Sequence, residues 1–593
     1  MELTKEQKSK FIKLGISSWC ELALLIPNSY EDLRLKSKLE DGSAQVIDAT
    51  VQSISKTPKT IQITFYAHNF SHEVYGVVFS PKPYMIHQFQ EGDRAFFYGV
   101  IECKMGRCSM NMPKRVSNVG DIKPKYKTPM RTDVMARFVQ NNLTLDRLLD
   151  EGLLEDIAKV LLSIHMPKEG ASYSKDEKLY ALKFCEIYNY MKRLKRSKKE
   201  FSSFEAGMCE YETWAKQSLP FKLTDEQIKA IEAIRGDFLS NKAARRIVVG
   251  DVGSGKTMVI LASALMNYPN RSILMAPTTV LANQLFSEAK HYLTNMRVGL
   301  VSNKSKIEDL DSYDFLIGTH ALLYRDLPHA TLVMVDEQHR FGTKQRASLE
   351  KFMSHESSHA HYIQFSATPI PRTQAMIESA HIDVSLITTT PYKKDITSKV
   401  ISKRDFKDLL VHIKDEISQN RQVLIVYPLV EQSDALEYQS LDEARGYWEK
   451  NFDSVYVTHG KDREKERVLK EFDKDGSLLL STTVVEVGIS LPRLSTVVIV
   501  GAERLGLSTL HQLRGRVSRV GLKGYCFLYT NKDQSKRLDQ FCKTSSGFDI
   551  ALLDLKFRKS GDLLRGQRQS GEAFKWIDLA EDESIIKDVK PYI

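Results

Sequence analysis

The residues best suited to chemistry form a glycine-rich loop at 250–257. Gly250, Gly255, Lys256 and Thr257 match the pattern G-x-x-x-x-G-K-[ST] without a mismatch. Glycines let backbone N–H groups curl around phosphate oxygens, and a lysine at this position supplies a mobile cation. The threonine hydroxyl can act as a ligand of Mg²⁺. The pattern therefore predicts a site for the phosphates of a nucleoside triphosphate.

The segments on either side of the loop support the same prediction. The apolar, β-branched run 247–249 predicts a strand before it, and 258–266 predicts a helix after it. A helix N-terminus adds positive potential where the phosphates would lie. A glycine-rich turn that binds nothing is the alternative, and strand, loop and helix together disfavour it. The residues expected to bind the nucleotide here are Gly250, Gly253, Ser254, Gly255, Lys256 and Thr257.

Two adjacent acids follow another apolar run. Residues 332–335 predict a strand, and Asp336 and Glu337 stand at its end. Ligands of α/β proteins bind at the carboxyl ends of parallel strands, so both carboxylates can face the phosphates. We expect Asp336 to hold Mg²⁺, usually through its water, and Glu337 to orient and deprotonate the attacking water. An acidic turn without chemistry is common for a lone Asp-Glu pair, but the phosphate loop favours the catalytic interpretation.

Three arginines lie close together in the C-terminal half of the chain: Arg514, Arg516 and Arg519. An arginine that neutralises charge in the transition state greatly assists phosphoryl transfer. If these residues belong to a second domain that closes on the nucleotide, they complete a site in the first domain. Hydrolysis would then depend on domain closure, and this dependence can drive a motor.

The elements that must position these residues alternate between strands and helices. From Leu219 onward the pattern is the one that a parallel sheet with crossover helices requires. One series of predicted strands precedes Pro391 and a second follows it. The first comprises 247–249, 272–275, 315–317, 332–335 and 362–365, and the second 422–427, 455–458, 478–481, 496–500 and 525–529. We expect two tandem doubly wound α/β domains, of which only the first carries a phosphate loop.

The N-terminal part has a different pattern. Residues 8–26 are helical in their periodicity, with a break at Gly15. From 45 to 116, short alternating strands separated by turn signals favour a small β-barrel of the OB-fold type. Such barrels often bind single-stranded nucleic acid through exposed aromatic side chains. Phe79 and Tyr84 are the candidate aromatics, and packing in the core is an equally weighted alternative for both.

Composition limits the class of protein. The 593 residues are 42% hydrophobic and 27% charged, which is ordinary for globular proteins, and no apolar run is long enough to predict a membrane span. The net charge of +10 fits a polyanionic partner without proving one. Because the seven cysteines are scattered without a C-x-x-C pattern, we expect reduced thiols in a cytoplasm, and no zinc site at Cys103 and Cys108.

Taken together, these blocks resemble the motifs of superfamily 2 helicases and translocases. Residues 219–227 look like the adenine-reading Q motif, which implies that Phe221 and Gln227 contact the nucleotide. Residues 366–368 match the Ser-Ala-Thr motif, which links the ATP state to nucleic-acid binding through Ser366 and Thr368.

Four further blocks extend the resemblance. Residues 275–278 are similar to motif Ia, and 318–320 to motif Ib. Residues 482–488 resemble motif V, with Glu486 as a coupling residue, and 512–519 resemble motif VI. The resemblance implies that Gln512 contacts the nucleotide, while Arg516 and Arg519 act on the transition state.

Within this superfamily the chain resembles the RecG family of bacterial branched-DNA translocases. The blocks that carry the resemblance are 250–257, 336–342, 367–373, 503–507 and 554–571. The last of these looks like the TRG motif, a helical hairpin and loop that converts motor closure into duplex movement. Its coupling residues would be Arg558, Arg568 and Gln569. The predicted barrel takes the place of the family's wedge, which favours stacking of Phe79 and Tyr84 on unpaired bases.

The resemblance implies a domain organisation. We expect an N-terminal helical segment (1–44), an OB-fold wedge that binds branched DNA (45–120), and a linker with a helical region (121–210), in which 121–131 is the linker. The ATP-binding RecA-like domain (211–390), the second RecA-like domain (391–535), and a TRG-like hairpin with the tail (536–593) complete it. The charge pattern of the basic stretch 190–199 favours a solvated helix face, with contacts to phosphates as the alternative.

The implied activity is an ATP- and Mg²⁺-dependent double-stranded-DNA translocase and helicase of the 3′-to-5′ type. It would regress stalled replication forks and migrate Holliday junctions in recombination and repair, recognising DNA by shape and backbone. The implied setting is a monomer in a bacterial cytoplasm, associated with the nucleoid. D-loops, R-loops and a single-strand-binding protein are further candidate partners.

The chain departs from the family pattern in three places. Ser490 stands where motif V usually has an aspartate, the end of motif VI lacks two glycines, and 558–561 reads Arg-Lys-Ser-Gly instead of Arg-Gly-Pro-Gly. The alternatives are another superfamily 2 DNA motor with the same tail, such as a transcription-repair coupling factor, an RNA helicase, and a scaffold that uses ATP only as a switch. The predicted barrel and the chain length disfavour the coupling factor, and Asp-Glu-Gln-His at 336–339 with the TRG-like tail disfavours the RNA helicase. The intact catalytic residues disfavour the scaffold: Lys256, Asp336, Glu337, Arg516 and Arg519.

Overall fold

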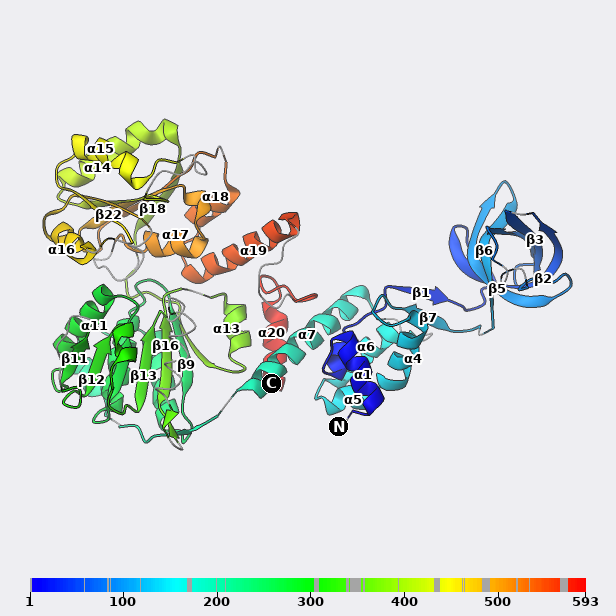
Figure 1. The fold of residues 1–593 in the computed structure, drawn as a ribbon, viewed down its shortest axis with the longest axis horizontal. Helices are drawn as coiled ribbons and strands as arrows, with labels where there is room; N and C mark the ends of the chain where they lie inside the picture. Colours follow the sequence, from blue (N-terminus) through cyan, green and yellow to red (C-terminus); the bar gives the residue numbers. More distant parts are fainter. Residues whose placement is uncertain are drawn as a thin grey trace. The chain divides into compact units, whose positions relative to one another are not determined.

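The computed structural model places most of the chain in two compact units (Figure 1). One comprises 1–192, 573–577 and 584–593, and the other comprises 193–572 and 578–583. The described residues are 3–593 except 58, 83–84, 86, 118, 168–172, 199, 208, 303–308, 338–340, 342–353, 356–357, 369, 393, 431–437, 461, 463, 483–490, 519–520, 533 and 566–573.

A closed five-stranded barrel forms where the sequence predicts an OB fold. Its strands pair in the order β2-β3-β4-β6-β5. They are β2 (Ser43–Lys56), β3 (Thr60–Ala67), β4 (His72–Phe79), β5 (Arg94–Lys104) and β6 (Arg107–Val116). Alternation along β3 buries Ile61, Ile63 and Phe65, and Phe65 packs against Phe97 with ring centroids 4.6 Å apart. The predicted barrel is therefore confirmed, with its apolar core inside.

Helices make up most of the remainder of this unit. They are α1 (Lys5–Leu14), α2 (Trp19–Ala23), α4 (Thr132–Asn142), α5 (Leu145–Asp150), α6 (Glu155–His165), most of α7 (Lys175–Ser197), and α20 (Glu583–Val589), which leads into η6 (Lys590–Tyr592). A capping box between Thr4 and Gln7 begins α1, and Gly15, at φ 69°, ends it as the sequence predicts.

Two short strands correct the predictions on either side of the barrel. β1 (Ser29–Asp32) lies in the segment expected to be helical, and β7 (Ile122–Lys125) lies in the expected linker. They pair antiparallel, with Ser29 opposite Lys125. Each strand has only four residues, and about 90 residues of sequence, which include the whole barrel, separate it from its partner. Short-range periodicity therefore carries no signal for this ribbon.

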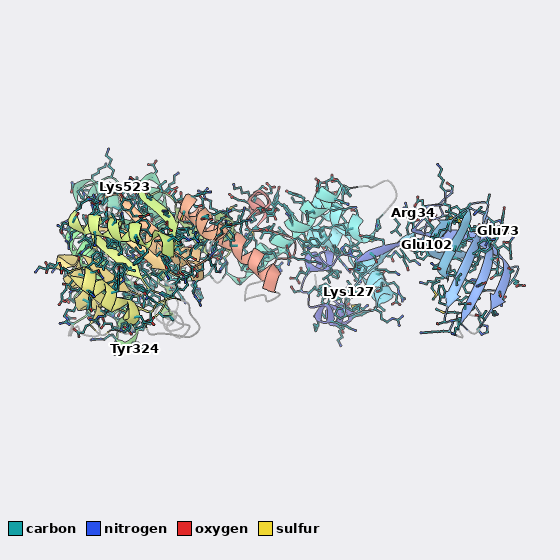
Figure 2. The ribbon with its side chains drawn as sticks, turned by 90° about the horizontal axis from the view of Figure 1, so that it is seen from above. Arg34, Glu73, Glu102, Lys127, Tyr324 and Lys523 are labelled. Carbon is teal, nitrogen blue, oxygen red and sulfur yellow. A yellow bond between two sulfur atoms is a disulfide. The ribbon has the colours of Figure 1, made fainter. Side chains whose placement is uncertain are left out.

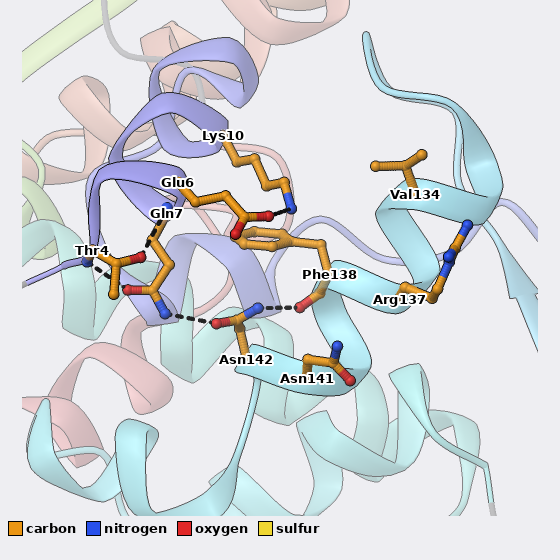
Figure 3. Close-up of a pocket in the computed structure, with 9 residues that line it drawn as sticks. All are labelled: Thr4, Glu6, Gln7, Lys10, Val134, Arg137, Phe138, Asn141 and Asn142. Atoms are coloured by element: carbon orange, nitrogen blue, oxygen red, sulfur yellow. Dashed lines mark hydrogen bonds and ion pairs between the residues drawn. The ribbon is translucent and has the colours of Figure 1, made fainter.

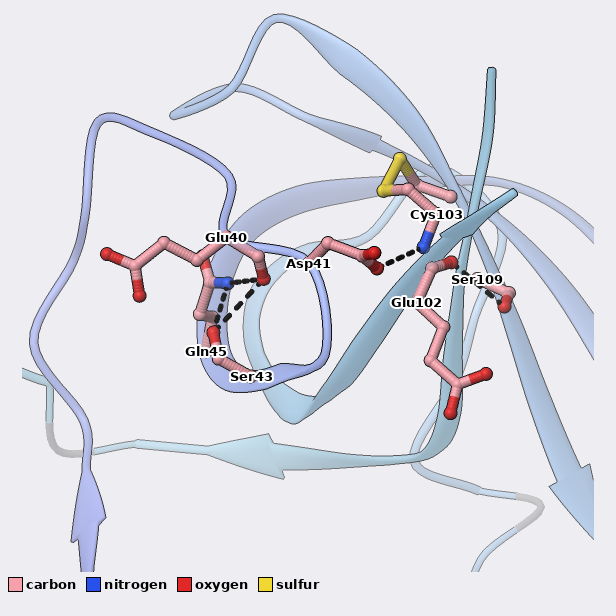
Figure 4. Close-up of a disulfide and its surroundings, with 8 residues drawn as sticks. Glu40, Asp41, Ser43, Gln45, Glu102, Cys103 and Ser109 are labelled. Carbon is pink, nitrogen blue, oxygen red and sulfur yellow. Dashed lines mark hydrogen bonds between the residues drawn. A yellow bond between two sulfur atoms is a disulfide. The ribbon is translucent and has the colours of Figure 1, made fainter. Parts of the chain in front are cut away.

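A disulfide between Cys103 and Cys108 contradicts the expectation of reduced thiols at these positions (Figure 4). The tight turn of Met105 and Gly106 between β5 and β6 places the two cysteines directly opposite each other, with Cα atoms 4.0 Å apart. The backbone N–H of Cys103 donates a hydrogen bond to Asp41 Oδ1 at 2.7 Å. The other five cysteines are free.

The first α/β domain is built on a parallel sheet with the order β11-β12-β10-β13-β16-β9-β17 (Figure 1). Its strands are β9 (Arg245–Gly250), β10 (Ser272–Met275), β11 (Val298–Val301), β12 (Phe315–Gly318), β13 (Leu332–Asp336), β16 (His361–Ser366) and β17 (Asp383–Ile387). Its helices are α8 (Tyr211–Gln217), α9 (Asp225–Phe238), α10 (Lys256–Asn267), α11 (Thr279–Tyr292), η1 (His320–Tyr324) and α13 (Arg372–Glu378), and a small sheet joins β8 (Ser202–Ser203), β14 (Ser354–His355) and β15 (Ser358–His359). Because β13, β16 and β9 are neighbours, their carboxyl ends meet at one edge.

The second α/β domain has a parallel sheet with the order β18-β23-β22-β19-β21-β20. Its strands are β18 (Ile396–Ile401), β19 (Gln422–Val426), β20 (Val455–Thr458), β21 (Leu478–Ser481), β22 (Leu494–Val500) and β23 (Gly524–Tyr529). Its helices are η3 (Lys403–Asp405), α14 (Phe406–Ser418), α15 (Leu441–Asn451), α16 (Lys465–Asp475), η5 (Ala502–Arg504) and α17 (Leu507–Arg514), followed by α18 (Lys536–Lys543) and α19 (Gly547–Arg565). Two tandem RecA-like domains, as predicted, hold the candidate site.

Among the residues that the structure describes, every helix falls short of the length and hydrophobicity needed to cross a lipid bilayer.

Candidate nucleotide site and motor interface

The glycine-rich loop joins the end of β9 to the start of α10. Gly253 and Gly255 have φ angles of 83° and 76°, a region that side-chain-bearing residues rarely adopt. A Cβ atom on Gly255 would also lie 2.2 Å from Gln227 Nε2. Ser254 is fully buried, and its Oγ has no hydrogen-bond partner within the described residues. The loop thus has the backbone geometry of a phosphate cradle.

Lys256 folds back into this loop. Its Nζ donates hydrogen bonds to the carbonyl oxygens of Gly250, at 2.9 Å, and Asp251, at 3.1 Å. Burial lowers the pKa of the amine, while the carboxylates of Glu337 and Asp336 oppose that shift. Thr257 follows in the first turn of α10 and is partly exposed. The lysine therefore uses backbone carbonyls in place of an anionic partner.

Asp336 and Glu337 stand at the carboxyl end of β13, as predicted. Asp336 is buried, and within the described residues its Oδ1 has no hydrogen-bond partner. Burial, and next the nearby charge of Glu337, raise the pKa of Asp336 to about 7. Glu337 has an unusual φ of 51°, and its Oε1 accepts a 2.7 Å hydrogen bond from the backbone N–H of Ala367. The second acid is therefore held against the Ser-Ala-Thr segment.

Gln227 contacts the phosphate loop directly. Its Oε1 accepts from Thr224 N at 2.8 Å, and its Nε2 donates to the carbonyl oxygen of Ser254 at 2.8 Å. The side chain thus caps α9 and fixes the loop. Phe221, the other residue expected in the Q motif, is 37% exposed.

The Ser-Ala-Thr segment contacts both motor domains. Ser366 Oγ accepts from Thr368 N at 3.2 Å, which closes a tight turn. From the second domain, Gln512 Nε2 donates to Thr368 Oγ1 at 2.9 Å. The predicted nucleotide contact of Gln512 stays a prediction; in the structure its amide is hydrogen-bonded to Thr368.

Asp251 makes a second connection between the domains, and the sequence analysis missed it. Its Oδ1 lies 2.5 Å from His511 Nε2, and its Oδ2 accepts a 2.8 Å hydrogen bond from the backbone N–H of Gly547. Burial raises the pKa of Asp251, but the bonds from His511 and from backbone N–H groups outweigh it and lower the pKa to about 2. The motif pattern allows any residue at position 251, so the motif does not predict this contact. The only signal in the sequence is that an acid directly follows Gly250.

The turn after Asp251 is also held by the second domain. Lys394 Nζ donates to the carbonyl oxygens of Val252, at 3.2 Å, and Gly515, at 3.0 Å. A Cβ atom on Gly515 would lie 2.6 Å from Val252 Cγ1, so this glycine permits the close approach. The phosphate loop and motif VI are therefore in direct contact.

Two of the three candidate arginines lie within the described residues. Arg514 is buried within the second domain, where it donates to the carbonyl oxygen of Phe541 at 3.1 Å and lies over its ring. Burial lowers the pKa of Arg514. Arg516, just after the close contact of Gly515, is only partly buried. Arg519 lies outside the described residues.

Five other predicted residues belong to parts that the structure does not describe. Tyr84, Glu486, Arg568, Gln569 and the departure Ser490 lie outside the described residues, and so does the side chain of Arg558.

Of the two candidate aromatics of the barrel, Phe79 lies within the described residues. Phe79, at the end of β4, is 53% exposed, which excludes the alternative that it is a core residue. On the same strand Tyr75 is also exposed, and the guanidinium of Arg107 lies 5.9 Å from its ring centre. Acidic side chains, Glu73 and Glu102, also project from the barrel (Figure 2). The barrel therefore combines exposed aromatic rings with charges of both signs.

The segment after 573 is anchored to α7. The carboxylate of Glu186 accepts the backbone N–H groups of Lys575, Trp576 and Ile577 at 2.7, 2.9 and 2.9 Å. Earlier in α7 than Glu186, Tyr180 OH donates to Asp588 Oδ2 at 2.9 Å. These contacts fix the tail that follows the expected TRG loop.

A pocket between α1 and α4 is separate from the nucleotide loop (Figure 3). Its polar groups bond to one another: Lys10 pairs with Glu6 at 2.5 Å, and Gln7 donates to Asn142 at 2.7 Å. Because these groups already have partners, we assign no ligand to it.

Comparison with known proteins gives concordant results. The DEAD/DEAH box helicase family matches residues 224–377, and the helicase conserved C-terminal domain matches 404–521. The ATP-dependent DNA helicase RecG of Helicobacter pylori is 43% identical, covering 97% of this chain and 96% of its own length. That of Streptococcus pneumoniae is 32% identical over 98% of this chain and 92% of its own length. A structure of RecG bound to a three-way DNA junction aligns with a TM-score of 0.57 and 25% identity, covering 100% of this chain and 84% of that chain.

Proposed function

Because the chain belongs to the RecG family of ATP-dependent DNA helicases, we propose that it is an ATP-driven double-stranded-DNA translocase that remodels branched DNA. It regresses stalled replication forks and migrates Holliday junctions, and so serves recombination and repair. The proposal is supported by the solved relative, whose title describes RecG on a three-way DNA junction.

One observation carries the motor part of the proposal. Consecutive residues of α17, His511 and Gln512, contact two parts of the first domain's site, Asp251 in the phosphate loop and Thr368 in the Ser-Ala-Thr segment. Any change in the nucleotide site that moves the loop or this segment therefore acts on the second domain. A site that used ATP only for local chemistry would not require these contacts.

Within the site, each residue has a proposed role in hydrolysis. Lys256 exchanges its carbonyl partners for phosphate oxygens when nucleotide enters the loop. Glu337, held by Ala367 N, orients the attacking water and accepts its proton. Arg516 and Arg519 contribute positive charge as the domains close. Phe221 and Gln227 position the base end of the nucleotide, and Gln512 approaches it on closure.

Thr257 and Asp336 fit a Mg²⁺ site. A hydroxyl and a carboxylate are the oxygen ligands that this ion prefers, and the buried Oδ1 of Asp336 has no other partner among the described residues. When bound, the ion supplies positive charge to the phosphate oxygens.

DNA is held by both parts of the chain in this proposal. The motor domains contact the duplex, with Ser366, Thr368 and Glu486 linking that contact to the ATP state. The barrel holds the branch point, where Phe79 and Tyr84 stack on unpaired bases. Arg558, Arg568 and Gln569 convert domain closure into duplex movement. We further propose a monomer that acts in a bacterial cytoplasm, with a single-strand-binding protein as a partner.

The test compares the ATPase rate without nucleic acid and with linear duplex, single-stranded DNA, a model fork and an RNA hairpin, at one salt concentration. Salt is fixed because phosphate contacts make affinity strongly salt-dependent. The proposal predicts the strongest stimulation by the fork. Equal or stronger stimulation by RNA would overturn it and leave only the two-domain motor.

A further inference from the structure

We propose that Asp251 is a coupling residue that transmits the nucleotide state of the phosphate loop to α17 and to the first turn of α19. The inference rests on the proposed motor function and adds a route distinct from the Ser-Ala-Thr segment. It follows from three contacts of one carboxylate, with the next residue of its own loop, with His511, and with Gly547.

The loop itself does not explain an acid at this position. The Asp251 carboxylate is buried, and burying an ionised group is costly unless it is well hydrogen-bonded. Only one of its donors, the N–H of Val252 at 2.6 Å, belongs to the loop. The other two come from His511 and Gly547, about 260 and 296 residues away in the sequence. The charge is therefore stabilised mainly by the second domain and by α19.

The hydrogen bonds define the state of His511. Arginine can only donate, so the 3.1 Å contact from Arg514 Nη2 makes His511 Nδ1 an acceptor. The proton of a neutral ring then lies on Nε2, which donates it to Asp251 Oδ1. Arg514 itself donates to the carbonyl oxygens of Phe541, at the end of α18, and Ser545, just before α19. A chain of hydrogen bonds thus connects the α18–α19 turn, through Arg514 and His511 of α17, to the phosphate loop.

The hydrogen bond from Gly547 to Asp251 links the phosphate loop to the start of a long helix. Its N–H is the first of α19, so the carboxylate lies at the positive end of that helix. α19 has 19 residues and is about 28 Å long, given 1.5 Å of rise per residue. It leads directly into the segment expected to form the TRG loop. A small shift of Asp251 is therefore carried to the far end of α19.

Nucleotide binding alters the backbone of the same residue. The Asp251 carbonyl accepts a hydrogen bond from Lys256 Nζ, the amine that must turn toward an incoming phosphate. When the lysine leaves, the Asp251 peptide loses a donor on the loop side, while its carboxylate stays bound to His511 and Gly547. The residue therefore connects the filled or empty state of the loop to the two helices.

Four variants separate this role from packing. Asp251→Asn removes the charge. His511→Phe keeps a ring of similar shape but has no nitrogen, whereas His511→Gln can still donate to Asp251 and accept from Arg514. Asp237→Asn is the matched control, because Asp237 is another largely buried carboxylate held by a side-chain donor, Arg246 at 2.6 Å, inside the first domain.

Two readouts are needed. The first is the number of fork base pairs regressed per ATP hydrolysed. The second is hydrogen exchange of residues 545–557 with and without a non-hydrolysable ATP analogue, whose binding is checked by fluorescence titration. The second readout needs no DNA, so it still tests the link if the wild-type chain fails to regress forks and the proposed function falls.

The proposal predicts that Asp251→Asn and His511→Phe reduce regression per ATP roughly fivefold or more and abolish the nucleotide-dependent change in exchange. His511→Gln keeps both readouts near those of the wild type. The double variant Asp251→Asn/His511→Phe is no worse than Asp251→Asn alone, and Asp237→Asn lowers only the melting temperature. The proposal would be overturned if His511→Phe showed wild-type regression per ATP and wild-type hydrogen exchange. It would also be overturned if the defect in His511→Gln were as large as that in His511→Phe. If Asp251→Asn does not fold, the two His511 variants decide alone.

Discussion

Gln512 Nε2 lies 2.9 Å from Thr368 Oγ1, and this hydrogen bond joins motif VI of the second RecA-like domain to the Ser-Ala-Thr segment of the first. One residue before Thr368 in that segment, the backbone N–H of Ala367 donates to Glu337 Oε1, the carboxylate of the proposed base. Two hydrogen bonds therefore connect the proposed base to the second domain. The following predictions depend on this arrangement and on the barrel.

Replacing Gln512 by leucine removes the bond to Thr368 at nearly constant volume. Because a typical hydrogen bond is worth about 1 kcal/mol, we expect fork stimulation of ATP hydrolysis to fall roughly fivefold. Steady-state ATPase assays with and without a model fork measure this. Gln284→Leu is the control, because it removes a side-chain bond within α11, to Glu288. Equal losses in the two variants would contradict a specific role for Gln512.

Lys256→Ala removes the cation of the phosphate loop. We expect hydrolysis to fall roughly 100-fold or more, since preorganised charge at developing phosphate oxygens contributes on this scale. Fork binding, measured by gel shift without nucleotide, is expected to stay close to that of the wild type. Loss of both activities together would mean that the substitution had damaged the fold.

Phe79→Ala tests the barrel. Stacking on an unpaired base contributes about 1–3 kcal/mol, so fork affinity is expected to weaken about tenfold, with little change in affinity for linear duplex. Tyr447→Ala, at an exposed aromatic of α15 in the second motor domain, serves as the control. Fluorescence anisotropy with both DNAs gives the comparison. An equal loss for fork and linear duplex would exclude stacking at the branch.

His165 predicts a pH dependence of local stability. Burial lowers its pKa, which the bond from Nε2 to the carbonyl oxygen of Ala23 only partly offsets, to about 4. The unfolded chain has the ordinary pKa of about 6.5 and therefore takes up the proton first as the pH falls. The contribution of His165 to the free energy of unfolding is therefore fully present above pH about 6.5. It declines as the pH falls toward 4, by about 3 kcal/mol in total.

Hydrogen exchange of residues 145–165 between pH 7 and 5, corrected for intrinsic rates, measures this decline. His165→Gln is the matched variant, because its amide can accept from Tyr126 OH and donate to Ala23 without titrating. A decline of the same size in His165→Gln would assign the effect to other groups.

Much of the fold follows from local sequence because the motor strands are apolar on both faces. β10, β20 and β21 have the predicted bounds, and their neighbours differ by one or two residues. The missed strands, β11, β17 and β18, are short or mix polar with apolar residues, since they lie at sheet edges. The ribbon of β1 and β7 and the disulfide depend on contacts that periodicity cannot reveal.

In the candidate site, too, local motifs predict some features, whereas contacts between distant parts of the chain give no local signal. The structure brings together Lys256, Asp336 and Glu337, because each follows or ends a strand of the same sheet. The spacing of the motifs predicts this arrangement. The contact of Asp251 with His511 requires two domains to meet, and no local pattern encodes which side chains then touch. For the same reason, motif resemblance predicts a nucleotide contact for Gln512 but does not indicate its hydrogen bond to Thr368.

The most direct test of the central claim follows regression of a fluorescently labelled model fork in real time. Wild-type protein is compared with Glu337→Gln, in ATP and in a non-hydrolysable analogue. An ATP-driven remodelling motor predicts regression by the wild-type protein in ATP alone, with both proteins binding the fork in every condition. Regression at the wild-type rate by Glu337→Gln, or by the wild-type protein in the analogue, would contradict it.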